Sequence, residues 1–149
     1  MELKSKLLAE CHSIVDERIR VLQEALDEAI AAGNEETKSS VGDKYETGRA
    51  MMQMEQDKYR IQLMKVNFLK NELAIIDLNK KYDKVEKGAL VLTQNGNYFI
   101  STSVGKLFID GEKYFAISVE APLSKALINK KEKDEVTFQH KKIVIETIF

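Results

Sequence analysis

Two carboxylates stand three residues apart in a polar stretch in the first third of the chain. The stretch reads SSVGDKYETGRA, from Ser39 to Ala50, and it contains Asp43 and Glu46. A spacing of three places both side chains on one face of a helix that begins there. The sequence therefore offers Asp43 and Glu46 as a pair of carboxylates that are able to act together at one site.

The same acids also have a purely structural interpretation. Acidic side chains in a first turn offset the positive end of the helix dipole and contribute about 0.3–1 kcal/mol. Ser40 together with Asp43 also resembles a variant capping box. Three cations, Lys38, Lys44 and Arg49, crowd the same stretch and are able to neutralise the acids or to contact RNA or a partner's carboxylates. Both interpretations stay open on the sequence alone.

Long helices are predicted on either side of the acids. From Glu2 to Ala32 there is no proline or glycine, and seam positions recur at alternating steps of three and four. Gly33 and Asn34 tolerate the left-handed conformation that ends helices, so the first helix is predicted to end there. A second heptad pattern runs toward Leu78, and together the two seams predict an antiparallel hairpin. The predicted seams are Leu8, Cys11, Val15, Arg18, Leu22, Ala25 and Ala29, and then Tyr45, Met52, Tyr59, Val66 and Leu73.

After Lys80 the pattern changes to short segments rich in β-branched and aromatic residues, which are typical of strands. Asn95-Gly96 and Asp110-Gly111 predict hairpins with type I′ turns. Pro122 predicts the start of one short helix between strands. The sequence thus predicts an α+β fold, with a helical hairpin over residues 1–80, its tip near 33–46, and a small antiparallel β domain over 81–149. The predicted strands cover 89–93, 97–101, 106–109, 114–119, 136–138 and 143–145.

Composition and motifs exclude several classes of function. The 149 residues carry 23 basic and 24 acidic side chains, so no general positive field exists to hold duplex DNA or an anionic membrane. No apolar run approaches the roughly 18 residues of a membrane span, and the N-terminus lacks the apolar block of a signal peptide, so we expect a cytoplasmic protein. His12 and His140 show no zinc-like spacing with Cys11 or any carboxylate. Without a nucleotide-binding or nucleophile motif, a self-contained enzyme is not expected.

The segment ISVEAPLSKALINKKEKDEV, from Ile117 to Val136, resembles a stretch of the Gre transcript-cleavage factors. Upstream, KGALV resembles the sequence with which the same domain of that family opens, which is a glycine, a small residue, any residue and then valine. Ala121 replaces the usual serine, and Asn129 and Lys133 replace glycines. Asparagine still adopts left-handed turns, whereas Lys133 predicts a changed turn type. The matching residues are Pro122, Leu123, Lys125, Ala126, Leu127, Ile128, Lys130, Asp134 and Val136.

The polar stretch also resembles the tip of that family, which reads G-D-x-x-E-N-A-x-Y. Residues 42–46, GDKYE, reproduce its first half, while Ala50 stands at the tyrosine position. The link from Gly33 to residue 42 is longer than the family's tight turn. A rival register over residues 33–37 aligns the first helix better but leaves no acidic pair.

The resemblance implies a fold, a partner and a mechanism. It implies an FKBP-like C-terminal domain docked on RNA polymerase through the surface around Ser118, Pro122 and Leu123, with the hairpin inserted into the secondary channel. Asp43 and Glu46 would then share Mg²⁺ with the polymerase, which itself cuts the backtracked nascent RNA. Two alternatives remain open: a channel-binding inhibitor or modulator without cleavage, and a structural coiled-coil adaptor.

Overall fold

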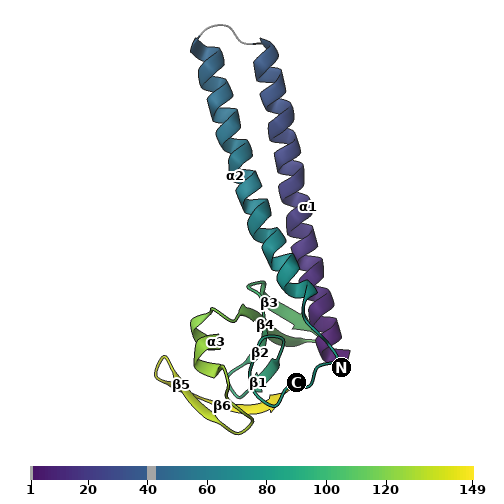
Figure 1. Cartoon of the computed structure of the whole chain (residues 1–149), viewed down its shortest axis with the longest axis vertical. Helices are drawn as coiled ribbons and strands as arrows, with labels where there is room; N and C mark the ends of the chain where they lie inside the picture. Colours follow the sequence, from purple (N-terminus) through teal and green to yellow (C-terminus); the bar gives the residue numbers. More distant parts are fainter. Residues whose placement is uncertain (1, 40–42) are drawn as a thin grey trace. The chain divides into compact units, whose positions relative to one another are not determined.

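The computed structural model describes residues 2–39 and 43–149, and it describes their side chains outside residues 35–46 (Figure 1). Helices α1 (Glu2–Ser39) and α2 (Asp43–Ala74) are followed by a six-stranded sheet and one short helix. The predicted α+β class is therefore confirmed. Contacts divide the chain into two compact units, Val15–Phe68 and Met1–Ile14 with Leu69–Phe149.

In the first of these units the two helices run antiparallel, as the seams predict (Figure 1). Gln56 donates a hydrogen bond from Nε2 to the main-chain oxygen of Ala29 at 3.4 Å, and Gly33 lies beside Met52. Ala29 thus lies beside Gln56, and Gly33, four residues later in α1, lies beside Met52, four residues earlier in α2. Such a pairing occurs only between antiparallel helices. Residues less than a tenth exposed here are Val15, Leu26, Ala29 and Leu63.

The prediction that the first helix ends at Gly33 is wrong. Helix α1 continues to Ser39, and Gly33 does not have the left-handed φ of a helix stop. A Cβ at Gly33 would lie 2.9 Å from Gln56 Nε2 and 3.6 Å from Met52 Cβ. The glycine therefore lies at a close approach between the helices, where the missing side chain leaves room for α2. The predicted seam also needs correction, because Leu7 rather than Leu8 is buried and Arg18 is exposed.

The other unit is built on a sheet with the strand order β3-β4-β2-β1-β6-β5. Neighbouring strands are antiparallel except β2 and β4, which are parallel. Every strand predicted from the sequence is present. Short helix α3 begins at Pro122, as predicted. The elements are β1 (Leu90–Thr93), β2 (Asn97–Ser101), β3 (Gly105–Ile109), β4 (Glu112–Ser118), α3 (Pro122–Leu127), β5 (Glu135–Phe138) and β6 (Lys141–Ile148).

One face of this sheet packs on α3 and the segment before β1. The hydrophobic core gathers apolar side chains of β1, β2, β5 and β6 around Leu127 of α3 and Val85. Removal of such side chains from water is the main stabilising contribution to a small β domain. The core members are Val85, Ala89, Val91, Ile100, Leu127, Val136, Ile143, Ile145 and Ile148.

The turns differ from prediction at one hairpin and agree at another. Asp110 and Gly111 have φ values of 51° and 82°, which fits the predicted type I′ turn. Asn95 and Gly96 do not have positive φ, so the prediction of a type I′ turn at these residues is wrong. Thr93 organises that turn instead, because its Oγ1 accepts hydrogen bonds from both main-chain N–H groups at 3.1 Å.

The expectation that Lys133 changes the turn is also wrong. Lys133 has φ 73° and Asn129 has φ 66°, so both keep the left-handed conformation that a glycine would adopt. The Lys133 N–H donates to the Ile145 main-chain oxygen at 2.7 Å, which holds the strained residue against β6. In the part of the chain that the structure describes, no helix is both long enough and apolar enough to cross a membrane.

Candidate functional site

The predicted acidic pair belongs to the beginning of α2. Helix α1 ends at Ser39 and α2 begins at Asp43, so Asp43 and Glu46 are positions of the first turn of α2. Their side chains, and those of Lys38 and Lys44, lie outside the described residues. The side chain of Arg49 is described and is exposed.

The rival register for the tip, residues 33–37, falls inside helix α1 and not between the helices. Residues 43–46 belong instead to the start of α2. Magnesium binding by Asp43 and Glu46 remains a prediction. Among the side chains that the structure describes, no three His, Cys, Asp or Glu residues gather closely enough to hold a metal ion.

The predicted docking surface lies at the turn from β4 into α3. Ser118 ends β4, and its Oγ accepts a hydrogen bond from the Glu120 N–H at 3.1 Å. Pro122 is exposed, whereas Leu123 is half-buried against the core. A shallow pocket of about 460 Å³ beside the turn includes Ser118 and Ala121 in its wall. Pro122 and Leu123 are not among its lining residues, so the structure brings only part of the predicted surface into one hollow.

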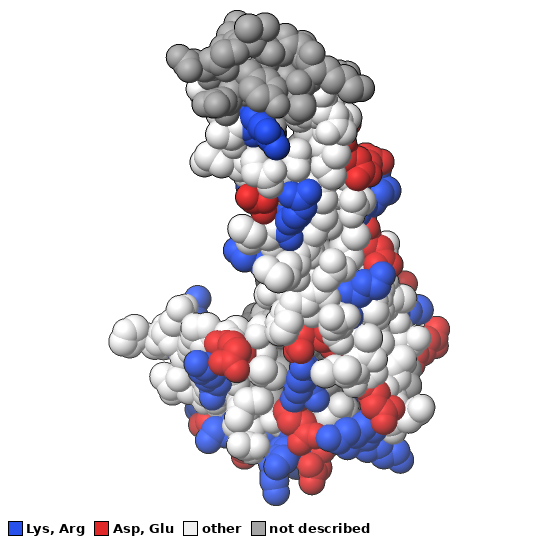
Figure 2. All heavy atoms as spheres, turned by 45° about the horizontal axis from the view of Figure 1, so that its top comes forward, with Lys and Arg blue, Asp and Glu red and all other residues white. Residues whose placement is uncertain are grey.

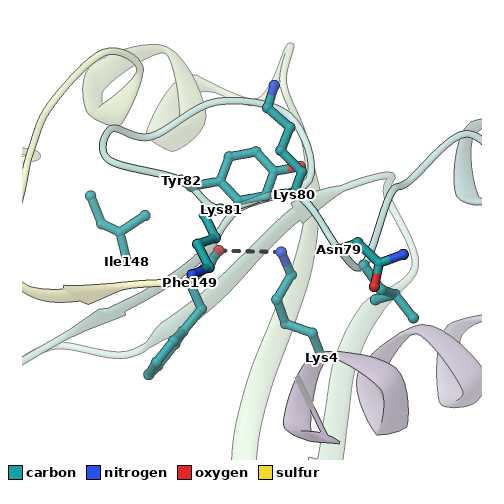
Figure 3. Close-up of a pocket in the computed structure, with 8 residues that line it drawn as sticks. Lys4, Asn79, Lys80, Lys81, Tyr82, Ile148 and Phe149 are labelled. Carbon is teal, nitrogen blue, oxygen red and sulfur yellow. Dashed lines mark hydrogen bonds between the residues drawn. The ribbon is translucent and has the colours of Figure 1, made fainter.

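Sequence reasoning missed a buried lysine at the start of α1. The side chain of Lys4 is only 1% exposed. Its Nζ donates a hydrogen bond to the main-chain oxygen of Phe149 at 3.2 Å and lies 4.3 Å from the ring centroid of Tyr82 (Figure 3). Lys4 stands seven residues before Cys11, and this heptad spacing is the signal that places it on the seam.

Lys4 forms part of the wall of a pocket of about 490 Å³ (Figure 3). Burial lowers the pKa of Lys4 to about 8, and the nearby carboxylate of Asp77 acts in the opposite direction. Burial also raises the pKa of Tyr82, while a hydrogen bond to Glu86 raises the pKa of Lys80. Lys80 approaches the same Tyr82 ring, with its Nζ 5.1 Å from the centroid.

The contacts of the Lys4 ammonium indicate a structural role. The hydrogen bond and the aromatic face fix the first turn of α1 to the end of β6 and to the segment before β1. Two ion pairs act at the same base: Lys6 with Asp110 at 3.1 Å, and Lys87 with Glu72. The base of the helices is therefore tied to the sheet by polar contacts as well as by packing.

The single thiol is not a reactive site. Cys11 is fully buried, and burial raises the pKa of its thiol to about 12. A thiol of this kind is a poor nucleophile at neutral pH because the reactive species is the thiolate. Cys11 therefore acts as an apolar packing residue of α1.

Charge on the molecule is mixed in sign. Figure 2 shows lysine and arginine side chains interspersed with aspartate and glutamate over the visible face. The full sequence has a net charge of −1, in agreement with this mixture. A surface of this kind does not bind nucleic acid through a broad electrostatic field.

Comparisons with models of known protein families gave no match, and no curated protein matches the chain.

Proposed function

We propose that this chain is a cytoplasmic transcription elongation factor of the Gre type, which binds RNA polymerase and stimulates cleavage of backtracked RNA. One observation carries the proposal. The Gre sequence pattern has glycine at three positions that are occupied here by Gly88, Asn129 and Lys133. The φ values of these residues are 96°, 66° and 73°. Left-handed backbone at non-glycine residues is uncommon. Its occurrence at both substituted positions supports a shared backbone course in this segment.

The order of elements supports the same proposal. Helices of 38 and 32 residues precede the β domain, and α3 begins at the proline of the resembling segment. Within the unit Val15–Phe68 the helices cover residues 15–39 and 43–68, which extend about 38 Å at 1.5 Å per residue. A hairpin of this length suits insertion into a deep channel of a large partner.

In the proposed mechanism the chain is not itself a nuclease. Asp43 and Glu46, at the start of α2, would hold Mg²⁺ jointly with carboxylates of the polymerase. When bound, such an ion stabilises the attacking and leaving oxygens of the cleaved phosphodiester. The turn around Ser118, Pro122 and Leu123 would dock on the rim of the channel, and nascent RNA would be met only at the hairpin tip.

Stalled, backtracked elongation complexes test the proposal. Wild-type protein is expected to accelerate RNA cleavage, and the double variant Asp43→Ala with Glu46→Ala is expected to lower that rate about 100-fold, because several kcal/mol of metal-assisted stabilisation are lost. The matched control is Glu28→Ala with Glu55→Ala, which removes the same charge from exposed positions away from the first turn of α2. This control should retain full activity.

Other outcomes separate the alternatives. If wild-type protein produces no cleavage, or if the tip double variant cleaves as well as wild type, the cleavage mechanism is rejected. Binding that competes for the channel without cutting RNA would identify a modulator. Stable self-association through the helices, without binding to polymerase, would identify an adaptor.

A further inference from the structure

Helix α2 carries a second apolar stripe on its outer surface. Within residues 47–68 of α2, five large apolar side chains are between 49% and 72% exposed. Exposed apolar side chains grouped on one helix face and bordered by polar residues often mark an interaction site. We call this set the outer stripe, and its members are Met51, Met54, Ile61, Met64 and Phe68.

The spacing of the outer stripe matches that of a coiled-coil seam. Met54, Ile61 and Phe68 lie seven residues apart, and Met64 follows Ile61 by three. The half-buried residues of the inner seam, such as Tyr59, stand two positions before members of the outer stripe, about 200° away around the helix at roughly 100° per residue. Helix α2 therefore has two heptad seams on nearly opposite faces. The inner seam packs on α1, and the repeat of the outer one fits another helix lying along α2.

The charges beside the outer stripe indicate which kind of partner helix fits along α2. A groove of about 440 Å³ runs over Met54 and Ile61, and Lys58 and Lys65 stand along it. The acid at this groove, Asp57, is already engaged, because it accepts hydrogen bonds from Gln53 at 3.0 Å and from Arg60 at 3.3 Å. The two lysines therefore give the groove a positive flank.

A second copy of this chain does not suit the outer stripe. If Met54, Ile61 and Phe68 are taken as heptad position a, then Lys58 and Lys65 occupy position e and Arg60 occupies position g, the positions that pair charges between helices. Parallel copies would bring Arg60 of one helix near Lys65 of the other. Antiparallel copies would bring the lysines together. Like charges at these positions oppose association.

We propose that the outer stripe of α2 binds an amphipathic helix of another protein, with apolar residues at a seven-residue repeat and acidic residues on their flanks. The apolar side chains supply affinity by leaving water. Lys58 and Lys65 select the partner by charge. This inference goes beyond the proposed action on RNA and does not require it.

A pair of synthetic helical peptides tests the inference with the full-length chain. Both peptides carry leucine at positions a and d over about four heptads, with glutamate at e and g in one and lysine in the other. Fluorescence anisotropy of the labelled peptides should show that the acidic peptide binds at least about tenfold more tightly than the basic one. The double variant Lys58→Glu with Lys65→Glu should reverse this preference.

Substitution within the outer stripe supplies the second arm of the test. Ile61→Gln should weaken binding of the acidic peptide about 10–100-fold, because one central apolar contact is lost. The matched control is Val21→Gln, which changes an exposed apolar residue of α1. It should leave the affinity unchanged. Since Ile61 is exposed, the variant should keep the helicity of the wild type, which circular dichroism checks.

Three results would overturn the inference. The first is the absence of binding by the acidic peptide, and the second is equal binding of the two peptides. The third is a dimer in sedimentation experiments that Ile61→Gln dissociates, since it would assign the outer stripe to a second copy. No polymerase is present in these assays, so failure here leaves the cleavage experiment unaffected.

Discussion

Lys4 links the stability of the protein to pH. Its pKa in the folded chain is about 8, against an ordinary value of 10.5. Between these two values the unfolded chain binds more protons than the folded chain, so the contribution of Lys4 to stability rises as pH rises. Below about pH 8 the lysine is protonated in both states, and this dependence disappears.

We predict that Lys4→Met removes this rise in stability. Urea unfolding at pH 7, 8, 9 and 10 should show wild type gaining about 1–3 kcal/mol relative to the variant over that range, the lower figure allowing for screening by water. The Phe149 oxygen keeps its hydrogen bond from the Leu90 N–H at 2.9 Å, so the substitution leaves no orphaned acceptor. Lys81→Met, at an exposed lysine of the same pocket, is the control and should follow the wild-type profile. Parallel profiles for wild type and Lys4→Met would contradict the prediction.

Lys133 is strained by its left-handed backbone. The left-handed conformation destabilises a residue with a side chain by roughly 1–2 kcal/mol. Glycine avoids this cost, but it has greater conformational entropy in the unfolded chain, which cancels part of the gain. Lys133→Gly should therefore raise the free energy of unfolding by about 0.5–1 kcal/mol. The same change at Lys131, which does not have positive φ, should lower it. Chemical denaturation of the two variants beside wild type measures both effects, and a loss of stability in Lys133→Gly would refute the argument.

At the scale of elements, Gly33 shows how packing overrides a local signal. Because Gly33 is helical, Gly33→Ala should raise the free energy of unfolding by up to about 1 kcal/mol through helix propensity. Its new Cβ meets only the flexible end of Gln56 closely, at 2.9 Å, and when that side chain moves it gives up only its long, 3.4 Å hydrogen bond to Ala29, which offsets part of the gain. Gly111→Ala, at a glycine with φ 82°, should instead destabilise by about 1 kcal/mol or more. Thermal unfolding of both variants measures these changes in stability. A loss in Gly33→Ala as large as that in Gly111→Ala would contradict the prediction.

The sequence was a good guide to the elements and a poor guide to their exceptions. Hydrophobic periodicity predicted the helix pair, because burial of one face imposes its period on the residues. Runs of β-branched and aromatic residues predicted all six strands, and Pro122 predicted the start of α3. The errors at Gly33 and at Asn95-Gly96 share a cause. A helical neighbour and the Thr93 hydroxyl decide those conformations, and neither influence lies in the local pair of residues.

The candidate sites were predictable only in part. Asp43 and Glu46 lie in the first turn of α2, where the sequence led us to expect the start of a helix, while their role at a site stays a prediction. The heptad step to Cys11 marks Lys4 as a seam position, but its contact with Phe149 joins residues 145 apart, and no local pattern predicts that contact. The outer stripe was missed for a different reason. Its residues share α2 with the inner seam, and burial alone distinguishes the two faces.

At the scale of the whole molecule, the two compact units differ in how well they exclude water. The central strands carry fully buried residues such as Leu90, Phe99 and Ile145, whereas most side chains described in the helices of Val15–Phe68 are at least partly exposed. Hydrogen exchange followed by mass spectrometry should therefore show amides of that helical unit exchanging at least about tenfold faster than amides of β1, β2 and β6. Uniform protection across both units would contradict this expectation.

The pairing of β1 with β6 joins two strands that are far apart in the sequence, so the sheet is completed late as the chain leaves the ribosome. Val91 pairs with Ile148, so the middle of the sheet closes across more than fifty residues of intervening chain. Helices α1 and α2 contain mostly local contacts and are complete long before that partner strand has been synthesised. We therefore expect the nascent chain to form its helices before the sheet is complete, and its exposed strand edges to need protection until β6 emerges.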